Sequence, residues 1–212
     1  MKKAIAINAS PRKNGNTALL LQEALRGVAA AGAETELVHL IDLDFKGCIS
    51  CFACKRLGNP NYGKCNLKDE LTPVLEKIAE ADVLLVGSPI YIGNVTGMAR
   101  NFIERQLFPY ITYSKETPSC WKGKLNCGYI FTQNCPAERS GMYESMYAAN
   151  AGNYRFFGGK VETMVAANTW QFDDYGKYSS SMFDVEEKRR LRDEEFPKML
   201  AEAYDLGRRL TE

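Results

Sequence analysis

Residues 82–88 read DVLLVGS, an apolar run that closes on Gly87 and Ser88. Uninterrupted apolar character is typical of a strand that is covered on both faces, as the strands of parallel sheets are. We therefore expect a buried strand here.

Outward from this run, strand-like and helix-like patterns alternate along the chain. Four more strands are expected, at residues 3–8, 34–40, 125–132 and 160–167. The helical spacing of apolar residues predicts helices at about 17–31, 71–78, 96–107, 140–156 and 184–210. This alternation predicts an α/β fold, a parallel sheet with helices on both faces. Such sheets bind ligands at the carboxyl ends of their strands, so we expect the chemistry in the loops after strands one, three and four.

Composition bounds the class of protein. The chain has 212 residues, 45% apolar and 25% charged, which excludes a wholly disordered chain. Its formal net charge of +1 argues against a nucleic-acid binder and against an acidic electron carrier that docks by charge alone. Without a long apolar run or a signal-peptide core, we expect no membrane partner and a cytoplasmic location. We expect one domain over residues 1–212, with a cysteine-rich insertion at about 44–68.

The loop after the first expected strand suits a phosphate group. It reads SPRKNGNT, residues 10–17, and leads into a helix whose first backbone N–H groups have no partners within the helix. Those N–H groups, the helix dipole and the cations Arg12 and Lys13 favour an anion. The structural alternative is a polar turn in which Asn16 or Thr17 caps the helix. No G-x-G-x-x-G motif occurs, so a dinucleotide-type site is not supported.

The loop after the third expected strand suits a flat ring. It runs from Ser88 to Thr96; Tyr91 and Ile90 offer apolar surface, and Gly93 permits close approach of the backbone. Asn94 can present both a donor and an acceptor to a heterocycle. The alternative is a helix entry that Thr96 caps.

Histidine and cysteine usage restrict the chemistry further. A single histidine, His39, excludes His-rich metal sites and argues against triad hydrolysis. Seven cysteines, an odd number without a secretion signal, favour a metal cluster or redox chemistry over a disulfide framework. Three of them, Cys120, Cys127 and Cys135, lack ligand spacing, and Cys127 is expected in the core.

The other four cysteines form a C-x2-C-x2-C-x10-C pattern: Cys48, Cys51, Cys54 and Cys65. The first three have the spacing of ferredoxin-type [4Fe–4S] ligands, and a more distant fourth ligand is normal. We expect the glycines and asparagines of residues 58–63 to form a compact turn that brings Cys65 back. A structural zinc site and metal-free cysteines are the alternatives.

Together, the motifs SPRKNGNT (10–17) and GSPIYIGNVTG (87–97) resemble the NADPH-dependent FMN reductase family of flavodoxin-like proteins. The cysteine segment resembles the iron–sulfur flavoprotein branch of that family. The resemblance covers about residues 1–165 in element order. It implies a flavodoxin-like three-layer sandwich with a five-stranded parallel sheet in the order 2-1-3-4-5.

The resemblance also implies a cofactor and the residues that hold it. The FMN phosphate is expected on Ser10, Arg12, Asn14, Asn16 and Thr17. The isoalloxazine ring and ribityl chain are expected against Pro89, Ile90, Tyr91, Gly93 and Asn94, and the other edge of the ring against the loop Thr132-Gln133-Asn134.

The expected activity is that of an FMN-binding oxidoreductase. It is either an NAD(P)H-dependent flavin or quinone-type reductase, or an iron–sulfur flavoprotein that passes electrons between FMN and a [4Fe–4S] cluster. Hydride transfer between stacked rings requires alignment more than a side-chain base, so no catalytic side chain is assigned. The alternatives are a non-enzymatic flavodoxin-like electron carrier and a phosphate or nucleotide sensor.

The expected partners follow from the same resemblance. They are NAD(P)H or a ferredoxin-like donor, a small-molecule or protein acceptor, and further copies of the chain in a homodimer or homotetramer. The aromatic segment 168–183 is expected over the flavin, at a subunit contact or packed on its own sheet edge. The charged run EEKRRLRDEE, residues 186–195, is expected as a solvated helix face.

Overall fold

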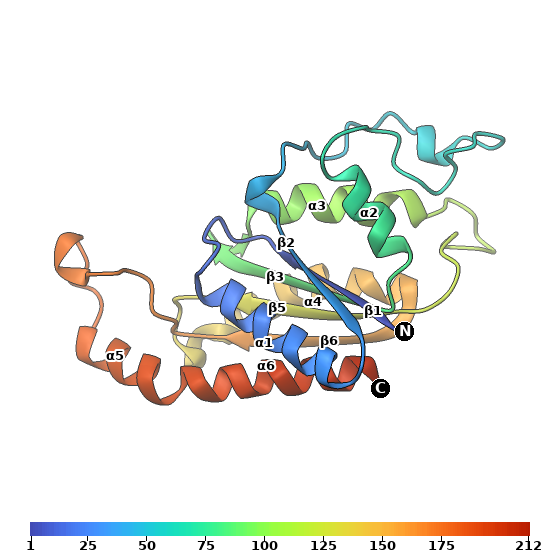
Figure 1. The fold of residues 1–212 in the computed structure, drawn as a ribbon. Helices are drawn as coiled ribbons and strands as arrows, with labels where there is room; N and C mark the ends of the chain where they lie inside the picture. The colour runs from blue at the N-terminus through green and yellow to red at the C-terminus, as the bar shows by residue number, and fades with distance from the viewer.

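The computed structural model describes all residues from Met1 to Glu212 and contains one sheet at its centre (Figure 1). Five parallel strands have the order β2-β1-β3-β5-β6, which confirms the expected flavodoxin-like topology. Their bounds are β1 Lys3–Asn8, β2 Glu34–His39, β3 Val83–Tyr91, β5 Leu125–Thr132 and β6 Gly158–Ala166. A sixth strand, β4 Asn94–Val95, pairs antiparallel with the end of β3.

Helices cover both faces of the sheet and complete three layers (Figure 1). On one face lie α1 Asn16–Ala30 and α6 Phe196–Thr211; on the other lie α2 Thr72–Ala79, α3 Gly97–Leu107 and α4 Glu144–Gly152. Helix α5 Val185–Glu194 precedes α6. Short 3₁₀ turns lie at Leu40–Asp42, Ala53–Lys55, Phe108–Tyr110, Ala137–Tyr143, Asn153–Phe157 and Tyr175–Lys177.

The strands alternate their side chains between two hydrophobic cores. In β1, Ile5 and Ile7 pack toward α2 and α3, while Ala4 and Ala6 pack toward α1 and α6. This alternation follows from the two-residue repeat of a strand, and burial on both faces explains why residues 4–7 of β1 and 83–86 of β3 are all apolar.

Two glycines set the distance between α1 and α6. A Cβ atom on Gly27 would lie 1.9 Å from the Tyr204 carbonyl oxygen, and one on Gly207 would lie 1.9 Å from the Ala24 carbonyl oxygen. The helices therefore touch through their backbones, at a separation that no larger residue permits.

Three expected elements need correction. The helix expected over 184–210 is divided between α5 and α6, because Pro197 near the start of α6 has no N–H to donate and its ring clashes with the preceding turn. The helix expected over 140–156 is α-helical only within α4 and has 3₁₀ turns at both ends. Strand β3 continues to Tyr91 because Ile90 and Tyr91 pair with Val95 and Asn94.

None of the helices combines the length and the apolar character needed to cross a membrane.

Candidate functional site

A cavity of about 430 Å³ lies where β1, β3 and β5 end. Ten of the expected cofactor-binding residues line it: Ser10, Arg12, Asn16, Thr17, Pro89, Ile90, Tyr91, Thr132, Gln133 and Asn134. The fold thus brings together the three loops that the sequence singled out. Asn14, Gly93 and Asn94 do not line this cavity, and their contact with the cofactor stays a prediction. Gly15, Ile92, Thr169, Trp170 and Gln171 complete its wall.

The loop after β1 is held tightly and leaves the start of α1 free. Ser10 accepts a hydrogen bond from the Arg12 amide (3.1 Å), and the Asn8 side chain accepts one from the Ser10 amide (3.1 Å). Gly15 occupies the helix N-cap and no side chain caps the helix, so the structural alternative, a cap by Asn16 or Thr17, is wrong. The first-turn N–H groups therefore remain available to an anion.

The two cations of this loop point to different places. Arg12 lines the cavity and donates to the Gln171 carbonyl oxygen. Lys13 lies outside the cavity and pairs with Asp42 at 2.7 Å. Only Arg12 is placed to contact a phosphate in the cavity.

Asn16 is oriented by contacts from the far end of the chain. Its Nδ2 donates to the Trp170 carbonyl oxygen at 2.7 Å, and its Oδ1 accepts from the Arg192 guanidinium at 2.9 Å. Arg192 belongs to α5, in the run that was expected to be a solvated face. This part of the expectation is wrong, and Arg192 is a residue that the sequence reading missed.

The loop after β3 is a strained hairpin tip. Ile92 has a φ of 50° and Gly93 a φ of 77° between the paired residues Tyr91 and Asn94. A β-branched residue in the left-handed region is uncommon, and such strain concentrates at functional sites. The side chain of Ile92 is fully exposed and that of Tyr91 is half exposed, so the tip presents an apolar surface at the mouth of the cavity.

The loop after β5 is fixed by Gln133. Its buried side-chain amide donates to Ser140 Oγ at 2.7 Å and accepts from the Tyr147 hydroxyl. Its backbone pairs with Ala166 and Thr169. Next to it, the Thr132 and Thr17 hydroxyls hydrogen-bond at 2.7 Å across the cavity floor. These contacts join the loop after β5 to the start of α1.

Lys188 of α5 also anchors this loop, against the expectation of a solvated run. Only 4% of the residue is exposed, and its ammonium donates to the side-chain oxygens of Asn134 and Asn168. It also reaches the carbonyl oxygens of Asn134 and Thr169, each at 3.4 Å. Burial lowers the pKa of Lys188 to about 8, because the charged form loses its hydration. The signal in the sequence was spacing: Lys188, Arg192 and the buried Phe196 recur every four residues.

The aromatic segment 168–183 packs on itself and beside the cavity. Phe172 stacks on Tyr178 with ring centroids 4.3 Å apart, and Trp170 and Phe172 contact Tyr175 edge-on. Thr169, Trp170 and Gln171 form one wall of the cavity. The segment therefore borders the cavity at the ends of β1, β3 and β5.

The four spaced cysteines line a second, small cavity of about 20 Å³. Hydrogen bonds within residues 56–64 form the compact turn that the sequence predicted, and the Gly63 amide donates to the Cys54 carbonyl oxygen at 3.0 Å. Burial, and the nearby thiols of Cys65, Cys51 and Cys48, raise the pKa of the Cys54 thiol. No three His, Cys, Asp or Glu side chains are gathered closely enough to hold a single metal ion.

The cysteine segment has the backbone of a wound loop. Ser50 and Phe52, on either side of Cys51, have φ values of 54° and 56°. Two non-glycine residues in the left-handed region within three positions are costly, and the cost marks a constrained loop. Apolar side chains, among them Phe52, Leu67 and Phe108, surround the thiols.

Arg105 of α3 connects the two ends of the cysteine segment. Its side chain is fully buried and forms a bidentate pair with Asp69, at 2.7 and 3.0 Å. The same guanidinium donates to the Lys46 carbonyl oxygen and to Cys65 Sγ, each at 2.9 Å. The pair holds the pKa of Asp69 below its usual value, chiefly through the hydrogen bond from Arg105. The sequence reading missed this arginine as well.

The remaining cysteines differ in position. Cys127 is buried in β5, as expected. Cys120 lies beside the cysteine segment, because its Sγ is 3.1 Å from the point where a Cβ on Gly63 would be. It does not line the small cavity.

Residues 2–127 match the family model of the NADPH-dependent FMN reductases. This match covers more than half of the chain and agrees with both loop motifs and the strand order. The chain belongs to the NADPH-dependent FMN reductase family. The family predicted from the two loops is confirmed.

Within this family, curated relatives carry the name iron–sulfur flavoprotein. One from Methanocaldococcus jannaschii is 41% identical over 103 residues, 49% of this chain and 51% of the relative. One from Archaeoglobus fulgidus is 44% identical over 103 residues, 49% of this chain and 48% of the relative. The matched segment thus spans about half the length of these curated relatives.

Solved structures agree with the fold. The NAD(P)H:quinone oxidoreductase from Methanothermobacter marburgensis has a TM-score of 0.67 at 16% identity and covers 100% of this chain and 98% of its own. An FMN-dependent NADH-azoreductase from Bacillus anthracis, in complex with FMN, has a TM-score of 0.66 at 14% identity, with full coverage of both chains. At these identities the likeness establishes the fold alone.

Proposed function

We propose that this chain is an FMN-dependent oxidoreductase that takes electrons from NAD(P)H and passes them to a flavin- or quinone-type acceptor. The observation that carries the proposal is the 430 Å³ cavity, which joins the uncapped start of α1, Arg12 and the hairpin tip at Tyr91. Membership of the FMN reductase family supports the choice of cofactor.

Different residues of the cavity would bind different parts of FMN. The first-turn N–H groups of α1, Ser10, Thr17 and Arg12 would hold the phosphate by charge-assisted hydrogen bonds. Tyr91 and Ile90 would pack against the ring, with Gln133 and Asn134 at its polar edge. When bound, FMN supplies the hydride and electron chemistry; the chain aligns it and excludes water.

We also propose that Cys48, Cys51, Cys54 and Cys65 bind a [4Fe–4S] cluster. A four-iron cluster takes one thiolate on each iron, so its ligands need not converge on a single point. Four thiols around one apolar cavity, a strained loop and an N–H···S contact from Arg105 fit that donor set. Four expectations stay predictions: the identity of the acceptor, the assembly into a homodimer or homotetramer, the single domain and the cytoplasmic location.

The visible spectrum of anaerobically purified protein tests both cofactors. We expect flavin absorption after FMN addition, a broad iron–sulfur shoulder, and steady NAD(P)H oxidation when a quinone is present. Flavin binding without NAD(P)H oxidation would favour an electron carrier. Protein that stays colourless after FMN addition would contradict the proposal and favour a phosphate or nucleotide sensor.

Tyr91→Ala tests the ring site. We expect weaker binding of FMN and riboflavin and a changed flavin spectrum, because an aromatic surface is removed where the ring lies. Tyr113→Ala is the matched control, since Tyr113 is exposed and lies outside the cavity. An unaltered spectrum and affinity in Tyr91→Ala would show that Tyr91 does not contact the ring.

Single cysteine variants test the cluster. Replacing any of Cys48, Cys51, Cys54 or Cys65 by Ala should remove most iron and acid-labile sulfide and leave FMN binding largely intact. Cys120→Ala is the strict control, because Cys120 is adjacent to the segment without lining the cavity. Zinc without sulfide would establish a structural thiolate site, and the absence of iron after anaerobic reconstitution would contradict the cluster.

A further inference from the structure

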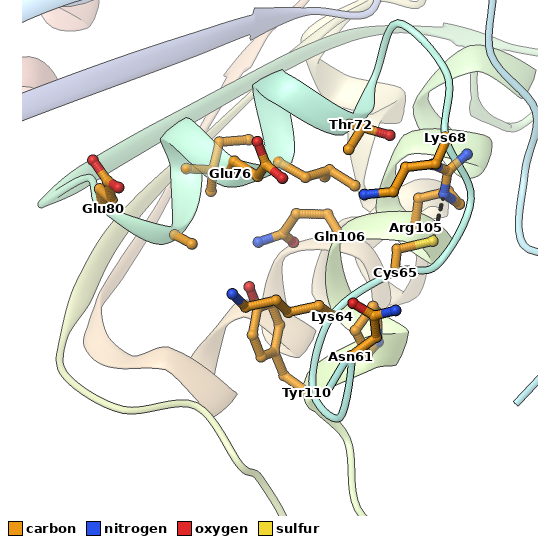
Figure 2. Close-up of a pocket in the computed structure, with 14 residues that line it drawn as sticks. Asn61, Lys64, Cys65, Lys68, Thr72, Glu76, Glu80, Arg105, Gln106 and Tyr110 are labelled. Carbon is orange, nitrogen blue, oxygen red and sulfur yellow. Dashed lines mark hydrogen bonds between the residues drawn. The ribbon is translucent and has the colours of Figure 1, made fainter. Parts of the chain in front are cut away.

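A third cavity, of about 470 Å³, lies between α2, the end of α3 and the cysteine segment (Figure 2). It is separate from the cavity at the ends of β1, β3 and β5, and the two share no lining residue. We call it the Gln106 pocket. Its volume is within the range of small-molecule sites.

Gln106 is the unusual residue of this pocket. Only 2% of it is exposed, yet neither its side-chain nitrogen nor its side-chain oxygen has a hydrogen-bond partner in the protein. Figure 2 shows its amide in the middle of the hollow, between Glu76 on one side and Lys64 and Tyr110 on the other. A buried amide without partners costs free energy, so such a group usually meets a ligand or water.

The contrast with Gln133 supports this reading. Gln133 is equally buried, and its amide has three partners: Ser140, Cys135 and Tyr147. The fold can therefore satisfy a buried glutamine where it is structural. At Gln106, which belongs to the pocket lining, the donor and the acceptor are both buried without a partner.

The charges of the pocket indicate the sign of the ligand. Lys64 and Lys68 flank Gln106 and form no ion pair or side-chain hydrogen bond. The neighbouring Arg105 is committed to Asp69 and Cys65. Glu76 lies beside the amide, on the side opposite Lys64, and Glu80 lies farther along α2 (Figure 2). The two free ammonium groups favour an anionic group on the side of the amide away from Glu76.

We propose that the Gln106 pocket binds a small anion that carries an amide-type edge, with an N–H donor beside a C=O acceptor. The edge pairs with the two unpartnered atoms of Gln106, and the anionic group contacts Lys64 and Lys68. Leu75, Ile78 and the Tyr110 ring supply the apolar wall for a flat body. Mononucleotides with an imide or carboxamide combine these features.

Isothermal titration calorimetry on FMN-saturated protein tests the proposal with two probes, uridine 5′-monophosphate and nicotinamide mononucleotide. We expect at least one to bind, about tenfold more weakly in Gln106→Leu and about three- to tenfold more weakly in Lys64→Ala. Lys77→Ala is the control and should bind as wild type, because Lys77 lies on α2 but pairs with Glu36 outside the pocket. Uridine and inorganic phosphate should each bind at least about tenfold more weakly than uridine monophosphate.

Several outcomes overturn the proposal. These are no binding of either probe at 10 mM, binding that Gln106→Leu leaves unchanged, and phosphate binding as tight as that of the nucleotide. Thermal unfolding of the ligand-free variant is an independent measurement. Leu removes two unpartnered polar atoms at similar volume, so Gln106→Leu should melt at or above the wild-type temperature. A clearly lower melting temperature would show that the amide has partners within the protein.

Discussion

Asp69→Asn is expected to be among the most destabilising single substitutions in this protein. The Arg105 side chain is fully buried and that of Asp69 is 19% exposed, and their two hydrogen bonds are 2.7 and 3.0 Å long. Asparagine keeps the shape but removes the charge that compensates the buried guanidinium. Breaking a buried pair in this way costs about 3–5 kcal/mol, a large part of the 5–15 kcal/mol by which domains are stable.

Urea unfolding at pH 7 measures this loss, with Glu194→Gln as the matched control. Glu194 pairs with Arg190 at 3.1 Å, but both side chains are more than half exposed, so that loss should be below about 1 kcal/mol. If Asp69→Asn and Glu194→Gln lose the same unfolding free energy, then removing the charge of Asp69 does not leave a costly buried charge on Arg105, and the reasoning is refuted.

The pH dependence gives a second measurement with a definite sign. Arg105 lowers the pKa of Asp69 in the folded state, so the ionised carboxylate favours folding above the unfolded pKa. This contribution should be lost as the pH falls below about 4 toward the folded pKa. The wild type should therefore lose more stability than Asp69→Asn over that acid range, and parallel acid profiles would contradict the ion pair.

Three further predictions address the cofactor site and the helix layer. Arg12→Ala should weaken FMN binding by about 1.5–3 kcal/mol and leave riboflavin, which lacks the phosphate, nearly unchanged; equal losses would show that Arg12 does not contact the phosphate. FMN affinity should fall as the pH rises through about 8, because deprotonation of Lys188 weakens its hydrogen bonds to Asn134 and Asn168. Fluorescence titrations of the Lys188→Met variant should lack this fall in affinity. Gly207→Ala should cost more than about 2 kcal/mol in urea unfolding, because its Cβ would meet α1 backbone, while Gly152→Ala, with open space around it, should be close to neutral.

Local patterns were sufficient for most of the fold. The apolar run of β3, the Thr96 cap of α3 and the glycine-rich turn before Cys65 depend on residues that are close in sequence. The order of the strands came from the resemblance of two loops to a family. The break within the long C-terminal helix was missed, because the charged run continued the helical spacing through Pro197.

The contacts that shape the sites join residues that are far apart in the sequence. Arg192 and Asn16 meet across 176 residues of sequence, and Lys188 and Asn134 across 54. From the sequence alone, Lys188, Arg192 and Arg105 resemble the charged residues found on the exposed face of any helix. Only the packing of α5 and α3 against loops removes their water and chooses their partners.

The sequence by itself predicted which segments line the two cavities, since the motif at 10–17, the motif at 87–97 and the cysteine spacing each lie within a short stretch. The tertiary structure alone decided which side chains reach the cavities: Arg12 and not Lys13, Gln106 without partners, Arg105 between Asp69 and Cys65. The physical reason is that burial and hydrogen-bond partners depend on what other elements bring near a side chain, and the neighbouring residues in the sequence do not contain that information.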